Sequence, residues 1–193
     1  MSQRLDLIRI LDDPESRLDA ADPAVRRIAV GAVSNHPHLL SRVIAMLASD
    51  PEPSVRRECA EVAGRIGTAP IAALERALTD PSPAVREAAT TALGEIAAPD
   101  SVERLIALAA DEDEDRLVRE AAVASLGAIG DERARPVLLT LVAAAPPQIR
   151  RRCVPALSVF DGAEIEAALR AAANDRNPMV REAAEMVVGR QRS

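Results

Sequence analysis

A Val-Arg or Ile-Arg pair recurs along this chain at nearly constant spacing, and the period constrains the fold more than any other feature. The six pairs are separated by 30, 30, 33, 31 and 31 residues: Val25-Arg26, Val55-Arg56, Val85-Arg86, Val118-Arg119, Ile149-Arg150 and Val180-Arg181. A period of about 20–50 residues is typical of solenoids, in which each repeat buries its apolar face only against its neighbours. Such proteins usually bind partners along an extended surface.

Helix start signals stand just before most of these pairs. Pro lies two residues before the Val or Ile in five of the six repeats, and Arg116 replaces it in the fourth. Pro is favoured in the first turn of a helix, and Ser, Asp or Asn is favoured at the N-cap. Caps of this kind occur at Asp22, Ser82, Asp115 and Asn177, with Glu52 and Pro146 as exceptions. Each repeat is therefore predicted to begin with a helix.

Apolar residues follow each Val at helical spacing and predict one buried stripe per helix. Four residues later stand Ala29, Cys59, Ala89, Ala122, Cys153 and Ala184; eight residues later stand Val33, Ala63, Leu93, Leu126, Leu157 and Val188. The next position holds Ser34, Gly64, Gly94, Gly127, Ser158 and Gly189. A small residue there either lets a neighbouring helix approach closely or ends the helix.

A second helix is predicted after each of the first five. Its apolar positions are Leu40/Val43/Leu47, Ile71/Leu74/Leu78, Val102/Leu105/Ala109, Leu138/Leu141/Val142 and Ile165/Leu169/Ala172. An additional opening helix carries Leu5, Ile8 and Leu11. We expect an all-α solenoid of about six repeats and about twelve helices, without strands. It forms one domain over residues 1–193, with an N-terminal cap helix in 1–21, five helix-pair repeats in 22–177 and a C-terminal capping helix in 178–193.

The repeat unit resembles a known family. Residues 80–96 (Asp-Pro-Ser-Pro-Ala-Val-Arg-Glu-Ala-Ala-Thr-Thr-Ala-Leu-Gly-Glu-Ile) and residues 126–134 (Leu-Gly-Ala-Ile-Gly-Asp-Glu-Arg-Ala) are similar to the HEAT-like repeats first described in phycobilisome lyases. The resemblance covers residues 22–189. It implies a right-handed superhelix whose second helices line the concave side. The family includes adaptors, enzyme subunits, lyases and designed binders, so the resemblance specifies the fold and leaves the function open.

Composition and charge narrow the function. The net charge of −6 argues against broad binding to nucleic acid or to anionic lipid, and no apolar run reaches the roughly 18 residues of a membrane span. The first residues carry an acid and lack the apolar core of a signal peptide, so we expect a cytoplasmic protein. All 24 basic residues are Arg. A GC-rich genome explains that bias, and the alternative is recognition of carboxylates or phosphates.

The repeated Arg has two interpretations. It could form a phosphate-binding ladder. Asp50, Asp80, Asp113 and Asp175 each lie five residues before the Val, however, and this favours structural Asp–Arg pairs within and between repeats. Structural pairing is the interpretation that we adopt.

The Cys and His residues predict no catalytic or metal site. Cys59 and Cys153 occupy the same core position three repeats apart, too far for a disulfide, and are expected to be buried as small apolar residues. His36 and His38 flank a Pro and could hint at a metal, but two donors without a nearby Cys or carboxylate pattern fall short of a zinc site. We expect a turn there and no metal or cofactor.

Two regions depart from the repeat. The acidic run at residues 111–115 could bind cations or a basic partner, or it could be a solvated turn whose last acids favour the next helix N-terminus. Repeat five contains Pro155 within its first helix, a basic cluster Arg150-Arg151-Arg152, and Phe160, the only aromatic residue, at a core position. Drift of this repeat and a functional bend both remain open.

The candidate binding residues come from the second helices, away from their apolar stripes. They are His38, Arg42, Arg76, Glu103, Arg104, Arg133, Thr140, Glu166 and Arg170. Arg42, Arg76, Arg104 and Arg170 are expected to form a discontinuous basic track among small Ala side chains. Arg is frequent at interface hot spots, although exposed Arg also serves solubility.

The preferred function is a non-catalytic scaffold or adaptor that holds a protein or peptide partner, with an acidic contacting segment, on the concave face. The chain lacks a nucleophile–base arrangement, a Gly-rich phosphate loop and metal-ligand spacing. The alternative is a subunit of a bilin-lyase-like or other enzyme complex, which rests on the resemblance alone. Nucleic-acid binding is less favoured because the aromatic platforms that stack bases are missing. A monomer is the expected oligomeric state.

Overall fold

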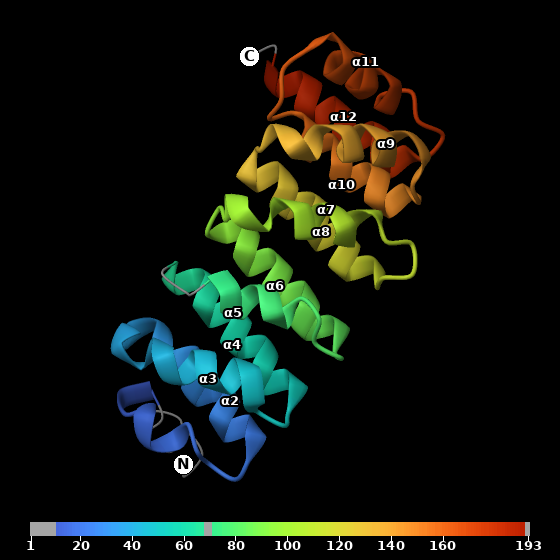
Figure 1. The fold of residues 1–193 in the computed structure, drawn as a ribbon. Helices are drawn as coiled ribbons and strands as arrows, with labels where there is room; N and C mark the ends of the chain where they lie inside the picture. The colour runs from blue at the N-terminus through green and yellow to red at the C-terminus, as the bar shows by residue number, and fades with distance from the viewer. Residues whose placement is uncertain (1–10, 68–70, 192–193) are drawn as a thin grey trace. The chain divides into compact units, whose positions relative to one another are not determined.

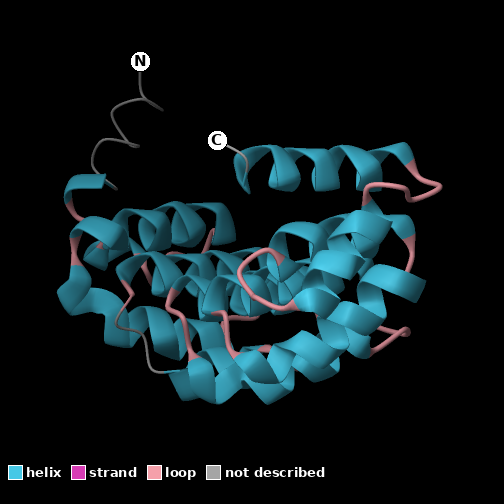
Figure 2. Ribbon diagram, turned by 90° about the horizontal axis from the view of Figure 1, so that it is seen from above, coloured by secondary structure: helices cyan, strands magenta, loops and turns pink. Residues whose placement is uncertain are grey.

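The computed structural model describes residues 11–67 and 71–191. Within these residues it contains eleven α-helices, α2 to α12, joined by turns and short 3₁₀ helices, and no strand (Figure 2). The helices divide into two compact units, Met1–Ile96 and Ala97–Ser193, each with its own internal packing. This confirms the predicted all-α repeat fold. The opening helix predicted at Leu5 and Ile8 lies outside the described residues, and the single-domain boundaries remain a prediction.

The first unit is built on three stacked first helices. These are α2 (Pro23–Ala32), α4 (Pro53–Ile66) and α6 (Pro83–Glu95), with α4 between the other two (Figure 1). The second helices α3 (Leu40–Ser49) and α5 (Ile71–Ala77) pack beside each other on the stack. Short 3₁₀ helices complete the unit at Glu15–Arg17, Val33–Asn35 and Pro37–Leu39.

The second unit repeats this arrangement. Its first helices α8 (Arg116–Ile129), α10 (Pro147–Leu157) and α12 (Pro178–Gln191) are stacked in order. Its second helices α7 (Val102–Ala110), α9 (Arg135–Ala144) and α11 (Ala163–Ala172) form the other layer, with α9 between α7 and α11 (Figure 1). Two 3₁₀ helices, Pro99–Ser101 and Glu132–Ala134, precede α7 and α9.

Each second helix packs mainly on the first helix of the following repeat. Thus α3 packs on α4, α5 on α6, α7 on α8, α9 on α10 and α11 on α12. The sequence pattern had grouped each second helix with the first helix before it. The structural pairs are therefore offset by one helix from the sequence pairs.

The helix starts largely follow the predicted caps. The carboxylate of Asp22 accepts a hydrogen bond from the Ala24 amide, and that of Asp115 accepts one from the Leu117 amide, both at 2.8 Å. Asn177 caps α12 in the same way through the Met179 amide at 3.0 Å. Ser82 was predicted as a cap but makes no side-chain cap bond. Its own amide is instead held by the Asp80 carboxylate at 2.8 Å, which fixes the turn before α6.

The predicted apolar stripe forms the core. Val33, Leu93, Leu126 and Leu157 are fully buried, as are both Cys residues. Phe160 is buried too, as expected from its position. Burial raises the pKa of both thiols, to about 12 for Cys153. Both cysteines are therefore packing residues.

At two of the repeats the small residue allows close helix contact, whereas Ser158 at the same position is the C-cap of α10 and Gly189 faces open space. A methyl group added at Gly64 would lie 3.0 Å from the Cα of Ala92 on the neighbouring helix α6. At Gly127 the corresponding distance to the Cα of Ala156 on α10 is 2.6 Å. Neither space admits a Cβ without movement of the backbone. The glycines that end helices are others, Gly67 and Gly130, which adopt left-handed conformations with φ of 73° and 68°.

The repeated Arg forms a structural ladder with three of the four predicted Asp residues, Asp50, Asp80 and Asp175. The prediction was wrong for Asp113, whose amide is bound by the Asp111 carboxylate in the lengthened turn before α8. Arg26, Arg56 and Arg150 each donate two hydrogen bonds to the carboxylate that precedes the next first helix, at 2.7–2.9 Å. The partners are, in that order, Asp50, Asp80 and Asp175. Each of these carboxylates also accepts a backbone amide two residues later. The carbonyl oxygens of the same three Asp residues bind the next Arg of the series, Arg56, Arg86 and Arg181, at 2.8 Å.

Repeat five departs from this regularity without losing its helix. α10 runs through Pro155 and ends at Leu157. Ala144 lies five residues before Ile149, at the repeat position of Asp50, Asp80 and Asp175. The Nε of Arg119 donates to the Ala109 carbonyl at 3.2 Å. In the acidic run, Asp111 accepts the Asp113 amide at 3.0 Å, and Asp115 caps α8. The run is therefore a turn whose final acid serves a helix start.

Candidate functional site

In the first unit, the predicted binding residues differ in how far they are engaged. His38 is exposed in the 3₁₀ helix before α3, where its ring packs edge-on against His36 with centroids 6.0 Å apart. Arg42 on α3 is bound to Asp19 at 2.5 Å and lies 3.8 Å from Glu15. Arg76, in the last turn of α5, is exposed and forms no ion pair within the described part of the chain.

A small hollow lies between the two second helices of this unit, and we call it the α3–α5 hollow. Its volume is about 160 Å³, and its lining residues are Ile44, Leu47, Ala48, Ala73, Arg76, Ala77 and Asp80. The Asp80 carboxylate is already bound by Arg56. The hollow therefore combines small apolar side chains with one available guanidinium group, that of Arg76.

In the second unit, most of the predicted residues bind one another or nearby backbone. Arg133 forms a two-point pair with Asp131 at 2.8 and 3.0 Å, and it also donates to the Pro99 carbonyl at 2.8 Å. Its Nη1 lies 3.6 Å from Glu103. The hydrogen bonds from Arg133 lower the pKa of Asp131 to about 2. This group bridges the start of α7 and the turn before α9.

The remaining predicted residues of this unit are exposed. The Thr140 hydroxyl donates a hydrogen bond to the Pro136 carbonyl at 3.0 Å. Arg170 pairs with Glu166 one helical turn earlier on α11, at 3.2 Å. Arg104 is exposed on α7. Of the four Arg residues of the expected basic track, Arg42 and Arg170 are thus neutralised by carboxylates of the chain itself, which weakens the expectation of a uniformly basic surface.

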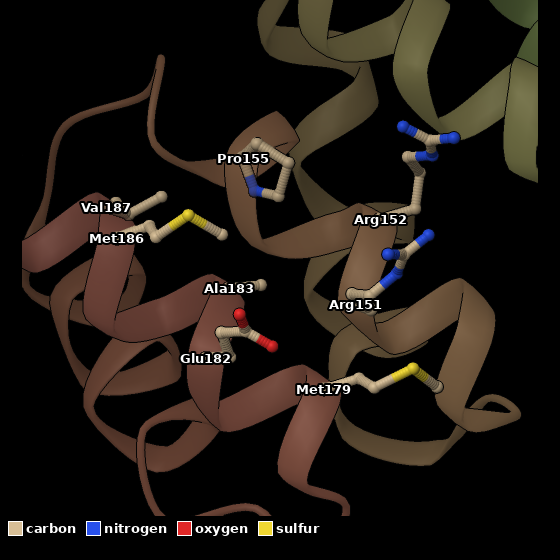
Figure 3. Close-up of a pocket in the computed structure, with 8 residues that line it drawn as sticks. All are labelled: Arg151, Arg152, Pro155, Met179, Glu182, Ala183, Met186 and Val187. Carbon is tan, nitrogen blue, oxygen red and sulfur yellow. The ribbon is translucent and has the colours of Figure 1, made fainter.

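A larger hollow lies on the other layer, between the first helices α10 and α12. This α10–α12 hollow has a volume of about 360 Å³ and is lined by Arg151, Arg152, Pro155, Met179, Glu182, Ala183, Met186 and Val187. Figure 3 shows Met186 and Glu182 on α12 facing α10, with Pro155 and Arg151 on the opposite wall. Arg152 extends toward Glu120 of α8, with 3.9 Å between Nη2 and Oε2.

Sequence reasoning did not single out this hollow. It noted Pro155 and the Arg cluster of repeat five, but it did not place them against α12, the expected C-terminal capping helix. The signal that could have found it is the placement of Met179 and Met186. Both are large apolar residues at positions one before and six after the Val of the repeat, outside the buried stripe.

The described residues contain no group of three or more His, Cys, Asp or Glu side chains that could hold a metal ion. Both thiols are buried, and their raised pKa values keep them protonated near neutral pH. None of the helices in residues 11–67 and 71–191 has the length and hydropathy needed to cross a membrane.

The family model for HEAT repeats matches residues 11–79 and 71–158. The chain belongs to the HEAT-repeat family. The matched segments contain α2 to α10, whereas α11 and α12 lie beyond them. One wall of the α10–α12 hollow is therefore built by a helix outside the segments that match the HEAT-repeat model.

Solved structures share this HEAT-repeat fold at low sequence identity. The Escherichia coli protein YibA is 18% identical with a TM-score of 0.69, and the match covers 97% of this chain and 74% of that one. The complex of CpcE and CpcF of phycocyanin lyase from Nostoc sp. PCC7120 gives 20% identity and a TM-score of 0.69, and the match covers 93% of this chain and 76% of the matched chain. A designed armadillo repeat protein in complex with the peptide (KR)4 is 16% identical with a TM-score of 0.62, and the match covers 95% of this chain and 98% of that one.

No curated protein matches the chain in sequence. The likeness to solved HEAT and armadillo structures, at these identities, concerns the fold alone. It places this HEAT-repeat protein among folds that commonly serve as protein-interaction scaffolds, in a group that also includes part of a lyase complex.

Proposed function

We propose that this protein is a non-catalytic interaction scaffold that holds a peptide segment of a protein partner on its second-helix layer. The observation that carries the proposal is the α3–α5 hollow, where Arg76 is exposed beside Ala73 and Ala77 and has no ion pair among the described residues. Every ladder Arg, by contrast, is bound within the fold.

The chemistry of this hollow favours an acidic segment. A guanidinium group presents a planar fork of donors that fits a carboxylate at two points. The small Ala side chains around Arg76 allow a peptide backbone to approach closely. Burial of such a pair in a contact would make Arg76 a main contributor to affinity, whereas a wet contact would contribute little.

The test is a charge reversal with a matched control. Arg76→Glu and the double variant Arg76→Glu, Arg104→Glu are compared with Arg27→Glu, which makes the same charge change on the exposed side of first helix α2. Partners are captured from the native host and quantified by mass spectrometry. We expect the second-helix variants to lose a captured protein that Arg27→Glu retains, with unchanged helicity. Equal capture by all variants would refute binding on this layer.

The second candidate is a subunit of a bilin-lyase-like complex, and the structural likeness to the complex of CpcE and CpcF is the observation that favours it. Phe160, the only aromatic residue of the chain, is buried, so no aromatic side chain is available to line a chromophore pocket. Mixing the protein with a linear tetrapyrrole and recording the absorbance spectrum separates the two candidates. A spectral shift at stoichiometric ratio would favour the lyase-type role.

A further inference from the structure

The same inter-helix hollow occurs in both units, at equivalent positions of the repeat. The α4–α6 hollow of the first unit has a volume of about 260 Å³ and is lined by Arg57, Glu61, Arg65, Glu87, Ala88, Thr91, Ala92 and Glu95. Counted from the Val or Ile of each repeat, Arg57 corresponds to Arg151, Glu61 to Pro155, and Thr91 to Met186. The two hollows can therefore be compared residue by residue.

The α4–α6 hollow is covered by ion pairs. Arg57 binds Glu61 one turn later at 2.8 Å, and Arg65 binds Glu58 at 3.2 Å and lies 4.0 Å from Glu61. Burial raises the pKa of Glu87, which lies on the opposite wall beside the charges of this cluster. Arg57, Arg65 and Glu61 are thus engaged in ion pairs, and an apolar ligand would gain little by displacing them.

In the α10–α12 hollow, apolar side chains take the place of the residues that form these ion pairs. Pro155 stands at the repeat position of Glu61; just beyond the end of α10 and outside the lining, Val159 stands at the repeat position of Arg65. On the facing helix, Met186 replaces Thr91, and Val187 replaces Ala92. Together, these differences remove the carboxylate and guanidinium groups that form ion pairs in the first unit. They put the thioether of Met186 and the branched side chain of Val187 in the hollow instead.

These apolar side chains are exposed. Met186 is 59% exposed, Met179 43% and Val159 55%, and Leu117 on neighbouring α8 is 53% exposed. Among the described residues, the one other large apolar side chain with comparable exposure is Leu11 of the first unit. Flexible Met side chains adapt to varied partners, and Met and Arg are enriched at protein interfaces.

The charge that remains around the hollow is basic on its α10 wall. Arg151 has lost the carboxylate one turn later that binds Arg57 in the first unit, and it forms no ion pair within residues 11–67 and 71–191. Arg152 lies 3.9 Å from Glu120, and that carboxylate is also bound by Arg116. Glu182 is the one acid that lines the hollow. A ligand that brings carboxylates to the α10 side would satisfy Arg151 and Arg152.

We propose that the α10–α12 hollow is a docking site for an acidic segment of a protein partner that carries a bulky apolar anchor side chain. The anchor enters the space between Pro155 and Met186, and flanking carboxylates bind Arg151 and Arg152. The volume of about 360 Å³ lies within the usual range of about 300–1,000 Å³ for ligand pockets. This inference rests on the proposed scaffold role, but it uses a different layer of the repeats from the α3–α5 hollow.

The test uses the full chain and a pair of synthetic peptides. The first is a fluorescein-labelled peptide of Glu, Leu and Phe, and the second carries Lys in place of every Glu. Binding is followed by fluorescence anisotropy. We expect the acidic peptide to bind at least about tenfold more tightly than the Lys peptide, because only the former satisfies Arg151 and Arg152.

Variants then locate the bound peptide. Met186→Thr restores the residue type of the first unit, and Pro155→Glu restores a carboxylate one turn after Arg151; each should weaken binding of the acidic peptide by about tenfold or more. The matched controls Thr91→Ala and Arg57→Ala, at the equivalent positions of the α4–α6 hollow, should leave it unchanged. Circular dichroism confirms that each variant keeps its helicity.

Several outcomes would overturn the inference. They are no binding of the acidic peptide up to about 1 mM, equal affinity for the acidic and the Lys peptides, or equal affinity of the wild type and Met186→Thr for the acidic peptide. Self-association of the wild type that Met186→Thr abolishes would identify a second copy as the occupant, and binding of anionic vesicles instead of the peptide would identify a membrane surface. If Arg76→Glu weakens peptide binding while Met186→Thr and Pro155→Glu do not, the peptide binds at the α3–α5 hollow. The proposed function then survives, and the proposal for the α10–α12 hollow fails.

Discussion

Arg56 and Asp80 form a two-point ion pair, with Nε and Nη2 of the arginine 2.7 and 2.8 Å from the two carboxylate oxygens. The side chains are only 11% and 10% exposed. The pair joins the first helix α4 to the turn that precedes α6, so it fixes the spacing of two neighbouring repeats.

Removal of one partner of this pair should destabilise the protein. Arg56→Ala leaves the Asp80 carboxylate in a mostly buried position without its main donor, and we expect the free energy of unfolding to fall by about 2 kcal/mol or more. Urea unfolding followed by circular dichroism measures it. Arg57→Ala, which removes an exposed Arg from the next position, should cost less than about 1 kcal/mol. Equal losses for the two variants would contradict a structural role of the ladder.

The same pair should make stability depend on pH in the acid range. Burial by itself would raise the pKa of Asp80, but the hydrogen bonds from Arg56 and from the Ser82 amide outweigh it and hold the pKa below its ordinary value. Asp80 therefore binds its proton more weakly in the folded chain than in the unfolded chain. Its contribution to stability is complete above the unfolded pKa of about 3.9 and is lost as the pH falls through the lower folded value.

Asp80→Asn should remove this contribution. The difference in unfolding free energy between the wild type and the variant is expected to be largest at about pH 6 and to shrink below about pH 4. Denaturant titrations at a series of pH values provide the measurement. A difference that stays constant down to about pH 2 would show that the carboxylate charge does not contribute.

Core truncation should be costly in either unit. Leu93 and Leu126 are fully buried at equivalent positions of α6 and α8. Replacement by Ala should lower the free energy of unfolding by about 2–5 kcal/mol, because each change removes buried methyl groups and leaves a cavity. Leu117→Ala, at an exposed position of α8, is the control and should be nearly neutral. A loss below about 1 kcal/mol for both buried positions would contradict the assigned register.

The close helix contacts can be tested with single methyl groups. Gly64→Ala and Gly127→Ala place a Cβ within 3.0 and 2.6 Å of a backbone Cα on the next first helix, so each should destabilise by about 1–3 kcal/mol. Gly31→Ala is the matched control, since its Cβ would meet only the flexible end of Glu58 at 3.2 Å. Thermal melts should show no loss for the control, because Ala favours helix more than Gly does. Unchanged melts at Gly64 and Gly127 would mean that the helices separate at little cost.

The thiols should report unfolding. Burial raises the pKa of Cys153 to about 12 and that of Cys59 further, so almost no thiolate exists at about pH 8. Labelling by a disulfide reagent at that pH should therefore be slow in the native protein and rapid in denaturant. Rapid labelling of either thiol under native conditions would show that its repeat opens frequently.

Several features of the fold could be predicted from the sequence because a repeat protein encodes its packing locally. The Val-Arg period, the Pro at the first helical turn and the 3.6-residue stripe predict the first helices, the burial of Leu93 and Leu126, and the inert role of both Cys residues. The recurrence of Asp at a fixed offset from Arg likewise predicts the ladder. Each of these depends on short-range geometry that is the same in every repeat.

The binding surface could be predicted only in part, because it depends on which side chains meet across helices. Arg76 lies off the apolar stripe of its helix and is exposed, and the four-residue spacing of Glu166 and Arg170 already favours their pair within one helix. The second-helix positions could not indicate, however, that Arg42 is bound by Asp19 from another part of the chain. The spacing of residues along one helix does not reveal a carboxylate that reaches its Arg from a different element.

The sequence by itself determined the helices, their buried stripes and the family, since periodic burial is written into every repeat. Only the tertiary structure decided that each second helix packs on the following first helix and that Pro155 and Met186 face one another across a hollow. Each residue of that hollow is ordinary within its own helix. The hollow exists because α10 and α12 pack side by side and bring Pro155 of one repeat near Met186 of the next. The spacing of residues along a single helix does not encode the distance between two helices.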